Sequence, residues 1–147
     1  MKSLPKPEDA KWAVKRINYK HLELERRNLS VFISQEGTRI GFGGIGKGYA
    51  ADRAKQLLQS LGVESGIVNA SGDLTLWGNQ PNGKAWTIGI ADPEHKYQPF
   101  ASLALHNAAI ATSGNYEKFI TIQGKKYSHN IDPRTGYPVQ GIKSTTI

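Results

Sequence analysis

Residues 39–61 read RIGFGGIGKGYAADRAKQLLQSL, in which five glycines and a lysine stand directly before a segment with helical periodicity. In that segment, apolar residues recur at i, i+4, i+7, i+8 and i+11, as they do on one face of an α-helix: Ala50, Ala54, Leu57, Leu58 and Leu61. Gly62 follows where a helix C-terminus favours glycine. The stretch therefore predicts a glycine-rich turn that leads into an amphipathic helix over residues 49–61.

Short strands are predicted on both sides of this helix. Upstream, residues 7–17 predict a short helix, and two alternating segments at 21–25 and 29–33 predict an antiparallel hairpin. Downstream, the sequence predicts strands at 66–70, 74–77, 86–91, 102–106 and 119–122, and the chain ends inside a strand-like segment, 143–147. Because strands outnumber helices, we expect an α+β fold: a mainly antiparallel sheet with hairpins and one or two packed helices.

The length and composition narrow the class of protein. A chain of 147 residues without internal repeats fits a single domain over residues 1–147. The absence of cysteine excludes disulfides, thiolate metal sites and a cysteine nucleophile. No apolar run approaches the roughly 18 residues of a membrane span. The net charge of +7 favours anionic partners, although scattered basic residues on a solvated face would give the same total.

The glycine-rich turn has the composition of a phosphate-binding loop. Glycines let backbone amides approach an anion closely and can adopt positive φ, while Lys47 and the following helix N-terminus add positive charge. Residues 41–46 fit the dinucleotide fingerprint G-x-G-x-x-G, but the flanking βαβ units are missing. Residues 41–47 fit most of a P-loop, with Gly48 where a Ser or Thr would be needed. The alternative is a tight strand-to-helix turn that binds no ligand.

Four segments together resemble one protein family. Residues 43–53 (GGIGKGYAADR) are similar to the GGIAKGYAVD-R signature of ApbE-type flavin transferases, and residues 68–74 (VNASGDL) are similar to its VNAGGD segment. Residues 111–117 (ATSGNYE) resemble its ATSGDYE motif, and residues 127–138 (YSHNIDPRTGYP) resemble its YSHIIDPRTGYP motif. The segments occur in the family's order, so the chain resembles most of the C-terminal half of an ApbE-type protein.

This resemblance implies an FAD:protein FMN transferase, an enzyme that moves FMN from FAD onto a threonine or serine hydroxyl of an acceptor protein and releases AMP. It implies FAD as the substrate, Mg²⁺ as the metal, and subunits of respiratory-type membrane complexes as acceptors. Family members are usually exported and often lipid-anchored. We therefore expect a periplasmic location or one on the outer face of the bacterial inner membrane, with membrane attachment only through an upstream anchor.

The resemblance also assigns candidate residues for catalysis and for the metal. His129 is the candidate for proton transfer, because imidazole titrates near working pH. Asp132 could orient His129, although residues 132–136 (DPRTG) also have the composition of a rigid turn. A main-chain carbonyl near Gly46 is the expected metal ligand, together with a carboxylate and a hydroxyl from an Asp-Ala-x-x-Thr-type segment that would follow this chain. We expect the chain without that segment to be inactive.

Further residues are candidates for binding FAD. The diphosphate would lie on the loop formed by Gly43, Gly44, Gly46 and Lys47. Asp73 would bind a ribose or amide group of the cofactor, or else cap a turn. Thr112 and Ser113 offer hydroxyls for phosphate or flavin, or else satisfy their own loop.

Two other classes of function remain open at this point. A non-catalytic nucleotide- or flavin-binding module would keep only the phosphate loop. A nucleic-acid-binding domain would rest on charge alone, because the sequence lacks the interleaved aromatic and basic residues of single-strand binders and lacks a recognition-helix signature. We therefore expect no nucleic-acid partner.

Overall fold

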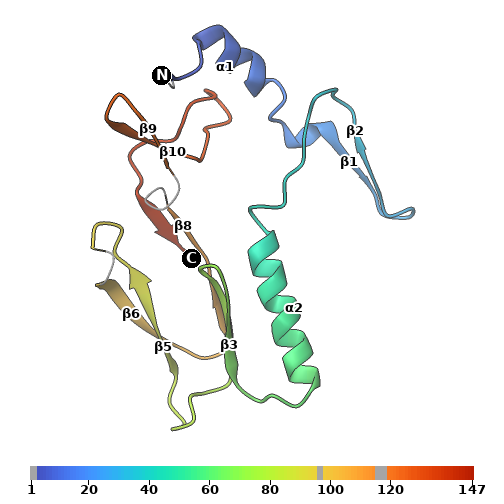
Figure 1. Cartoon of the computed structure of the whole chain (residues 1–147). Coiled ribbons are helices and arrows are strands. Elements are labelled where there is room, and N and C mark those ends of the chain that lie inside the picture. The colour runs from blue at the N-terminus through green and yellow to red at the C-terminus, as the bar shows by residue number, and fades with distance from the viewer. Residues whose placement is uncertain (1–2, 96–97, 115–118) are drawn as a thin grey trace. The chain divides into compact units, whose positions relative to one another are not determined.

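The computed structural model describes residues 3–95, 98–114 and 119–147 (Figure 1). The length predicts one domain over residues 1–147, and two units can be distinguished in the structure. Unit 1 comprises residues 1–41 and 115–142, and unit 2 comprises residues 42–114 and 143–147.

Unit 2 combines one helix with small antiparallel sheets (Figure 1). Its three-stranded sheet has the order β3–β4–β7, formed by Gly66–Ala70, Asp73–Trp77 and Ala108–Ile110. Two further pairs join β5 (Trp86–Ala91) to β6 (Pro99–Leu105), and β8 (Thr112–Gly114) to β11 (Ser144–Thr146). Strand β4 is central in its sheet, because it pairs with β3 on one edge and with β7 on the other.

The core of unit 2 lies where β4, β5 and β7 meet. Leu76 is fully buried, and Ile88 and Ile110 are buried against it. The neighbouring Trp77 is also buried, and its indole N–H donates to the carbonyl oxygen of Val63 at 2.9 Å. Trp77 pairs across the sheet with Gly66, where a Cβ would lie 2.7 Å from the indole ring. Glycine at that position therefore leaves the space that the ring occupies.

Helix α2 (Gly46–Ser60) packs on β3 and β4, and Ala51 is the residue that it buries most completely. The helix begins three residues before the predicted start at residue 49, so residues 46–48 form its first turn and are not part of the preceding loop. The glycines there do not prevent helix formation, because the first turn carries less of the propensity cost than a helix interior.

The C-terminus of α2 confirms the role predicted for Gly62. Gly62 has a φ of 86°, in the left-handed region that favours glycine. Its amide donates to the carbonyl oxygen of Gln59, and the amide of Val63 donates to the carbonyl oxygen of Leu58, both at 3.0 Å. These two bonds form a Schellman motif, which satisfies carbonyls that the helix leaves unpaired.

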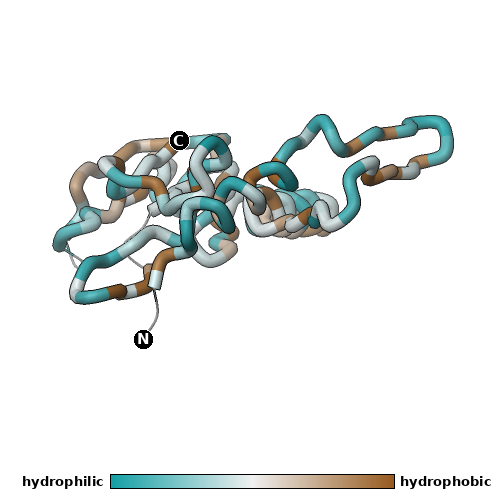
Figure 2. The backbone as a smooth tube through the Cα atoms, turned by 90° about the horizontal axis from the view of Figure 1, so that it is seen from above, coloured by the Kyte–Doolittle hydropathy of each residue, from teal (hydrophilic) through white to brown (hydrophobic). Residues whose placement is uncertain are grey.

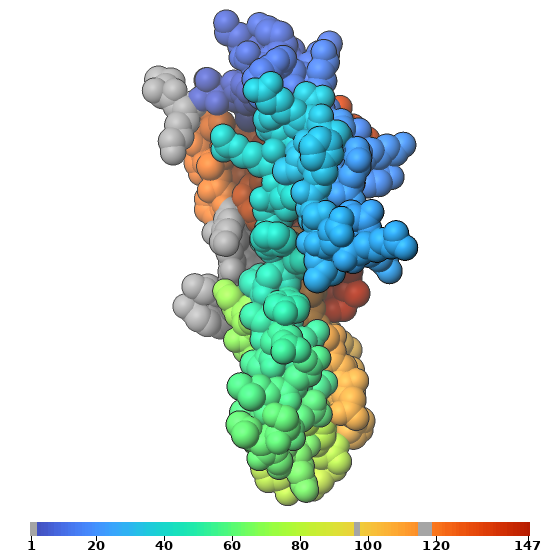
Figure 3. All heavy atoms as spheres, turned by 90° about the vertical axis from the view of Figure 1, so that its right-hand side faces the viewer, coloured from blue at the N-terminus to red at the C-terminus, as the bar shows by residue number. Residues whose placement is uncertain are grey.

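Helix α2, which is drawn in green in Figure 3, carries exposed apolar residues toward its C-terminal end. Leu57 is 61% exposed and Leu61 is 72% exposed, whereas Ala54 and Leu58 are half-buried. The apolar face that the periodicity indicates is therefore only partly covered by the sheet of unit 2.

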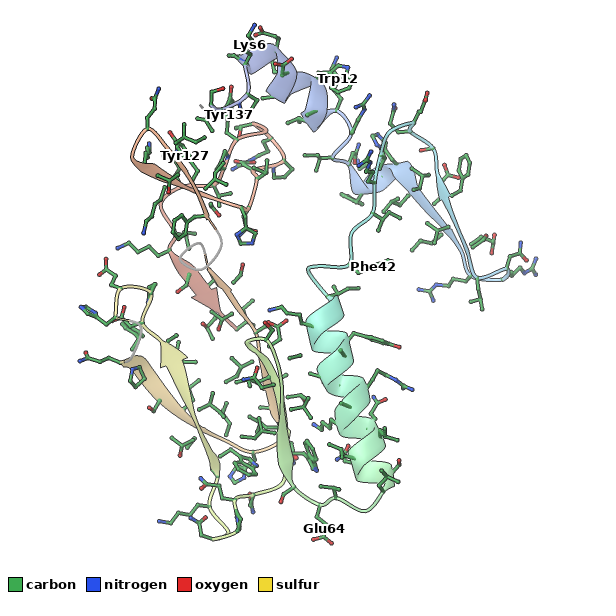
Figure 4. The ribbon with its side chains drawn as sticks, in the orientation of Figure 1. Lys6, Trp12, Phe42, Glu64, Tyr127 and Tyr137 are labelled. Atoms are coloured by element: carbon green, nitrogen blue, oxygen red, sulfur yellow. The ribbon has the colours of Figure 1, made fainter. Side chains whose placement is uncertain are left out.

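Unit 1 contains helix α1 (Pro7–Val14), the short 3-10 helix η1 (Tyr19–His21) and two hairpins. The hairpins pair β1 (Leu22–Glu25) with β2 (Ser30–Ile33), and β9 (Phe119–Ile122) with β10 (Lys125–Ser128). Residues 131–138 follow β10, and Gly136 in this segment lies close to α1. A Cβ on Gly136 would lie 2.9 Å from both the carbonyl oxygen of Ala10 and Cγ2 of Val14, and the Tyr137 hydroxyl donates to the carbonyl oxygen of Pro5 at 3.2 Å (Figure 4).

The α+β class with mainly antiparallel pairing is confirmed. The predicted helix at 7–17 ends earlier, at Val14, and the predicted strand at 102–106 is shifted toward the N-terminus in β6. Strands β7, β8 and β10 were not predicted as strands. Figure 2 shows that apolar stretches along the chain are short and interrupted by polar residues, and no described helix is long and apolar enough to cross a membrane.

We predict that Leu76→Ala lowers the free energy of unfolding by about 2–5 kcal/mol, because it removes a fully buried side chain and leaves a cavity. Urea denaturation of both proteins measures the difference. Leu103→Ala in β6 is the matched control. It should lower the free energy of unfolding by less than half as much, because Leu103 is 42% exposed. Equal costs would contradict the assigned core.

Candidate functional site

The first turn of α2 presents unpaired backbone amides. The amides of Ile45 and Gly46 donate to the carbonyl oxygen of Phe42, at 3.1 and 2.7 Å, and the amide of Tyr49 donates to Ile45 at 2.9 Å. The N-cap residue, Ile45, has no side chain that can cap the helix. Within the part of the chain that the structure describes, the amides of residues 47 and 48 therefore have no capping partner. They lie at the positive end of the helix dipole, which favours a bound anion.

The glycines of this loop are not explained by the fold of unit 2 itself. None of Gly43, Gly44, Gly46 and Gly48 has a positive φ, so the left-handed conformation that we expected from glycine is absent there. Apart from its chain neighbours and the adjacent backbone of α2, a Cβ added to any of them would meet no described atom within 4 Å. These glycines leave the backbone open to a group from outside the unit.

Lys47 joins the first turn of α2 to the β3–β4 hairpin. Its ammonium lies 2.7 Å from Oδ1 of Asp73 and donates to the carbonyl oxygen of Ser71 at 3.2 Å. The side chain of Asp73 is only 14% exposed, and that of Lys47 is 41% exposed. The first two motifs of the sequence analysis are thus brought together by an ion pair, and the charge of Lys47 is partly compensated before any ligand binds.

The hairpin that carries Asp73 has a defined local geometry. Ala70 pairs with Asp73, so Ser71 and Gly72 form a two-residue loop, with φ of 55° and 96°. Two successive positive φ values are typical of the type I′ turn that suits the twist of a hairpin. The amide of Gly72 also donates to Oδ1 of Asn69 at 2.9 Å. The turn therefore holds the carboxylate of Asp73 at the first position of β4.

Thr112 and Ser113 lie on a strand and not on a loop. They belong to β8, which pairs with β11 at the end of the chain. The hydroxyl of Thr112, which is half-buried, is hydrogen-bonded to the hydroxyl of Thr146 at 2.9 Å, while Ser113 is exposed. The hydroxyl of Thr112 thus already has a protein partner. The end of this motif, residues 115–117, lies outside the described residues.

His129 and Asp132 lie in unit 1, in the segment after β10. His129 is exposed, and the preceding Ser128 is buried and accepts the amide N–H of Asn130 at 3.0 Å. Asp132 makes its side-chain contacts with Arg134: Nε lies 3.0 Å from Oδ1, Nη2 lies 2.8 Å from Oδ2, and the backbone amide lies 2.9 Å from Oδ1. That Asp132 orients His129 stays a prediction.

The contact between Arg134 and the Asp132 carboxylate was not predicted from the sequence. The two residues are two positions apart on either side of Pro133, a spacing at which a side chain can fold back onto a turn. The Arg134 side chain, and then its backbone amide, lower the pKa of the Asp132 carboxyl from 3.8 to about 2. The amide N–H groups of Thr135 and Gly136 also donate to the carbonyl oxygen of Asp132, at 3.2 and 2.8 Å. The predicted turn is therefore stabilised by hydrogen bonds to both the carboxylate and the backbone carbonyl of Asp132.

The described residues fit a divalent cation poorly by themselves. They contain no group of three or more His, Asp or Glu side chains placed to hold a metal ion. Asp73, the candidate carboxylate of unit 2, is already paired with Lys47. A carbonyl such as that of Gly46 would leave Mg²⁺ without the carboxylate ligand that it favours. A magnesium site here needs further ligands.

Each of the remaining histidines is hydrogen-bonded to another side chain. His21 is bonded to Thr38, His95 to Asp92 and His106 to Asn79.

We predict that Arg134→Gln raises the pKa of Asp132 from about 2 toward its ordinary value of 3.8. In the unchanged protein, the contribution of this carboxylate to stability is fully present above its unfolded pKa and is lost as the pH falls toward about 2. Carboxyl carbon chemical shifts, followed by NMR through an acid titration, measure the change. Arg26→Gln removes the same charge from the β1–β2 turn and should leave Asp132 unaffected. An unchanged titration in Arg134→Gln would contradict the assigned pair.

The chain is similar to proteins of one known family. The ApbE family model matches residues 1–147. An FAD:protein FMN transferase of Klebsiella pneumoniae is 35% identical over 84% of this chain and 38% of its own length. An FAD:protein FMN transferase of Treponema pallidum is 31% identical over 92% of this chain and 41% of its own length.

Solved structures show the same similarity. The ApbE protein of Thermotoga maritima is 36% identical, with a TM-score of 0.90 over 98% of this chain and 46% of that protein. The flavinyl transferase ApbE of Pseudomonas stutzeri is 28% identical, with a TM-score of 0.81 over 99% of this chain and 44% of that protein. The chain thus spans less than half of the length of these relatives. Because the family model covers the whole chain and these structures superpose on nearly all of it, the chain belongs to the ApbE family.

Proposed function

We propose that this chain is part of an FAD:protein FMN transferase. In the proposed reaction, the hydroxyl oxygen of a threonine or serine on an acceptor protein attacks the phosphorus of the FMN half of FAD. A new P–O bond forms, the diphosphate bond to AMP breaks, and the hydroxyl proton passes to a base. One observation supports the proposal most directly. The ion pair of Lys47 and Asp73 joins the first two motifs at the N-terminus of α2, which has no side-chain cap.

The loop before α2 suits the diphosphate of FAD. Its glycines leave the backbone accessible, and the amides of residues 47 and 48 can donate to phosphate oxygens. Because the charge of Lys47 is partly compensated by Asp73, much of the attraction for an anion would come from these amides and from the helix dipole. Such pre-oriented donors stabilise phosphoryl transfer without reorganisation during the reaction.

His129 is the proposed proton acceptor. Its imidazole is exposed, and it lies three residues before the Asp132–Arg134 turn, which restrains the backbone of the segment. Neutral imidazole can accept the proton of an attacking hydroxyl near neutral pH.

Mg²⁺ is part of the proposal through family resemblance, and it would neutralise charge on the diphosphate when bound. The main-chain carbonyl of Gly46 is the proposed ligand from this chain, with the other ligands from segments beyond the described residues. The acceptor is proposed to be a subunit of a respiratory-type membrane complex. The reaction is proposed to take place in the periplasm or on the outer face of the bacterial inner membrane.

FMN transfer to a threonine-containing acceptor peptide, in the presence of FAD and Mg²⁺, tests the proposal. The assay compares this chain with a longer protein, the complete transferase. The complete transferase contains this chain together with the remaining parts of the ApbE fold that the relatives have. We expect transfer by the complete transferase and none by this chain alone, because it spans less than half of the length of its relatives and its described residues contain no cluster of side chains that could hold a metal ion. Equal turnover by both would contradict the assigned metal site. FAD binding without transfer by the complete transferase would instead identify a non-catalytic flavin-binding module.

We predict that Lys47→Ala in the complete transferase weakens FAD binding by about 1–3 kcal/mol, or about 5- to 150-fold in Kd, through the loss of a charge-assisted hydrogen bond. Flavin fluorescence titration at moderate salt measures Kd. Lys84→Ala removes the same charge from an exposed position outside the four motifs and should leave Kd within about twofold. An unchanged Kd in Lys47→Ala would remove Lys47 from the site.

We predict that His129→Ala lowers the transfer rate of the complete transferase by about 10²–10⁴ with little change in FAD affinity, because a proton-transfer group contributes little to ground-state binding. Single-turnover kinetics and fluorescence titration separate the two quantities. His106→Ala is the control, since His106 lies outside the four motifs and is bonded to Asn79. A rate within a few-fold of the unchanged enzyme would make His129 a structural residue.

A further inference from the structure

The N-terminus of a helix is an unfavourable place for a lysine. The helix dipole places positive charge there, and the first turn of α2 contains no acidic residue to offset it. Lys47 is nevertheless held at this turn, because Asp73 supplies a carboxylate 2.7 Å from its ammonium. A second hydrogen bond, to the carbonyl oxygen of Ser71, fixes the direction of the ammonium.

The two partners differ in how firmly the chain holds them. Asp73 has a short side chain on the first residue of β4, next to a turn with two positive φ values, and it is only 14% exposed. Lys47 has a long side chain with four rotatable bonds, and it is 41% exposed. The more rigid and more buried member of the pair therefore determines where the more mobile member lies.

Asp73 is also badly placed to bind an anionic cofactor directly. Its Oδ1 is taken by Lys47, and a carboxylate next to a diphosphate would repel it. The ammonium of Lys47 has three donors, of which Asp73 and Ser71 occupy two. One donor is left for a ligand, beside the open amides of residues 47 and 48.

We propose that Asp73 is a positioning residue, which holds the ammonium of Lys47 at the N-terminus of α2 and acts on a bound diphosphate only through Lys47. This inference rests on the proposed function, and it replaces the direct contact of Asp73 with a ribose or amide group that the sequence suggests. The first two motifs then act together. The β3–β4 hairpin positions the ammonium of Lys47, and Lys47 and the loop before α2 contact the anion.

A double-mutant cycle in the complete transferase tests the proposal, with Asp73→Asn, Lys47→Met and the double variant. The measured quantity is Kd for FAD and, in a parallel series, for inorganic pyrophosphate, which has no ribose or flavin. We expect Asp73→Asn to raise the Kd for both ligands by about 3- to 10-fold when Lys47 is present. In the Lys47→Met background, the same substitution should raise each Kd by less than about twofold. Thermal melting of each variant identifies any loss of folding.

Three results would overturn the proposal. Equal effects of Asp73→Asn in both backgrounds would mean that Asp73 acts independently of Lys47. A weakening seen with FAD but not with pyrophosphate would restore direct contact with the ribose or flavin. Tighter binding in Asp73→Asn would mean that Asp73 competes with the anion for Lys47. If the unchanged protein bound pyrophosphate but not FAD, the proposed function would fail, while the pyrophosphate series would still decide the role of Asp73.

Discussion

The pairing of β4 with both β3 and β7 is the constraint on which unit 2 depends. This strand carries Asp73 at its start and the fully buried Leu76 three positions later, so the core and the candidate site share one register. Successive side chains of a strand point to opposite faces, and a shift by one residue would therefore turn every side chain of β4 to the other face of the sheet. The position of Asp73 beside α2 is thus maintained by the same pairing that buries the core.

Local signals in the sequence predict the parts of this structure that depend on neighbouring residues. The helical period and Gly62 predict α2 and its C-terminus, because a Schellman motif is determined by a few consecutive residues. Alternation predicts the hairpin of β1 and β2 for the same reason. The start of α2 was predicted too late, because glycine disfavours a helix interior but is tolerated in a first turn.

Contacts between distant residues could not be predicted in this way. Thr112 and Ser113 have the composition of a loop, and they form a strand only because residues 144–146 supply a partner from the end of the chain. The ion pair of Lys47 and Asp73 spans 26 positions, and no spacing rule relates them. The first two motifs contain the residues that meet at α2, whereas the structure shows which of their atoms are in contact. The Arg134 contact is different, because it is local and follows from chemistry that the Asp-Pro-Arg sequence already displays.

The glycines before and within the first turn of α2 can be compared with glycines that the fold itself requires. Glycine in a helix costs up to about 1 kcal/mol relative to alanine, and a helix without an N-cap side chain forgoes about 1 kcal/mol more. At Gly66 and Gly136 the fold gives a reason for glycine, because a side chain would collide with the Trp77 ring or with α1. At Gly46 and Gly48 it gives none, since no described atom is near and φ is not positive. A sequence that is otherwise consistent with its fold departs from local preference mainly at functional sites. We therefore propose that the open amides at the N-terminus of α2 form a surface that binds an anion.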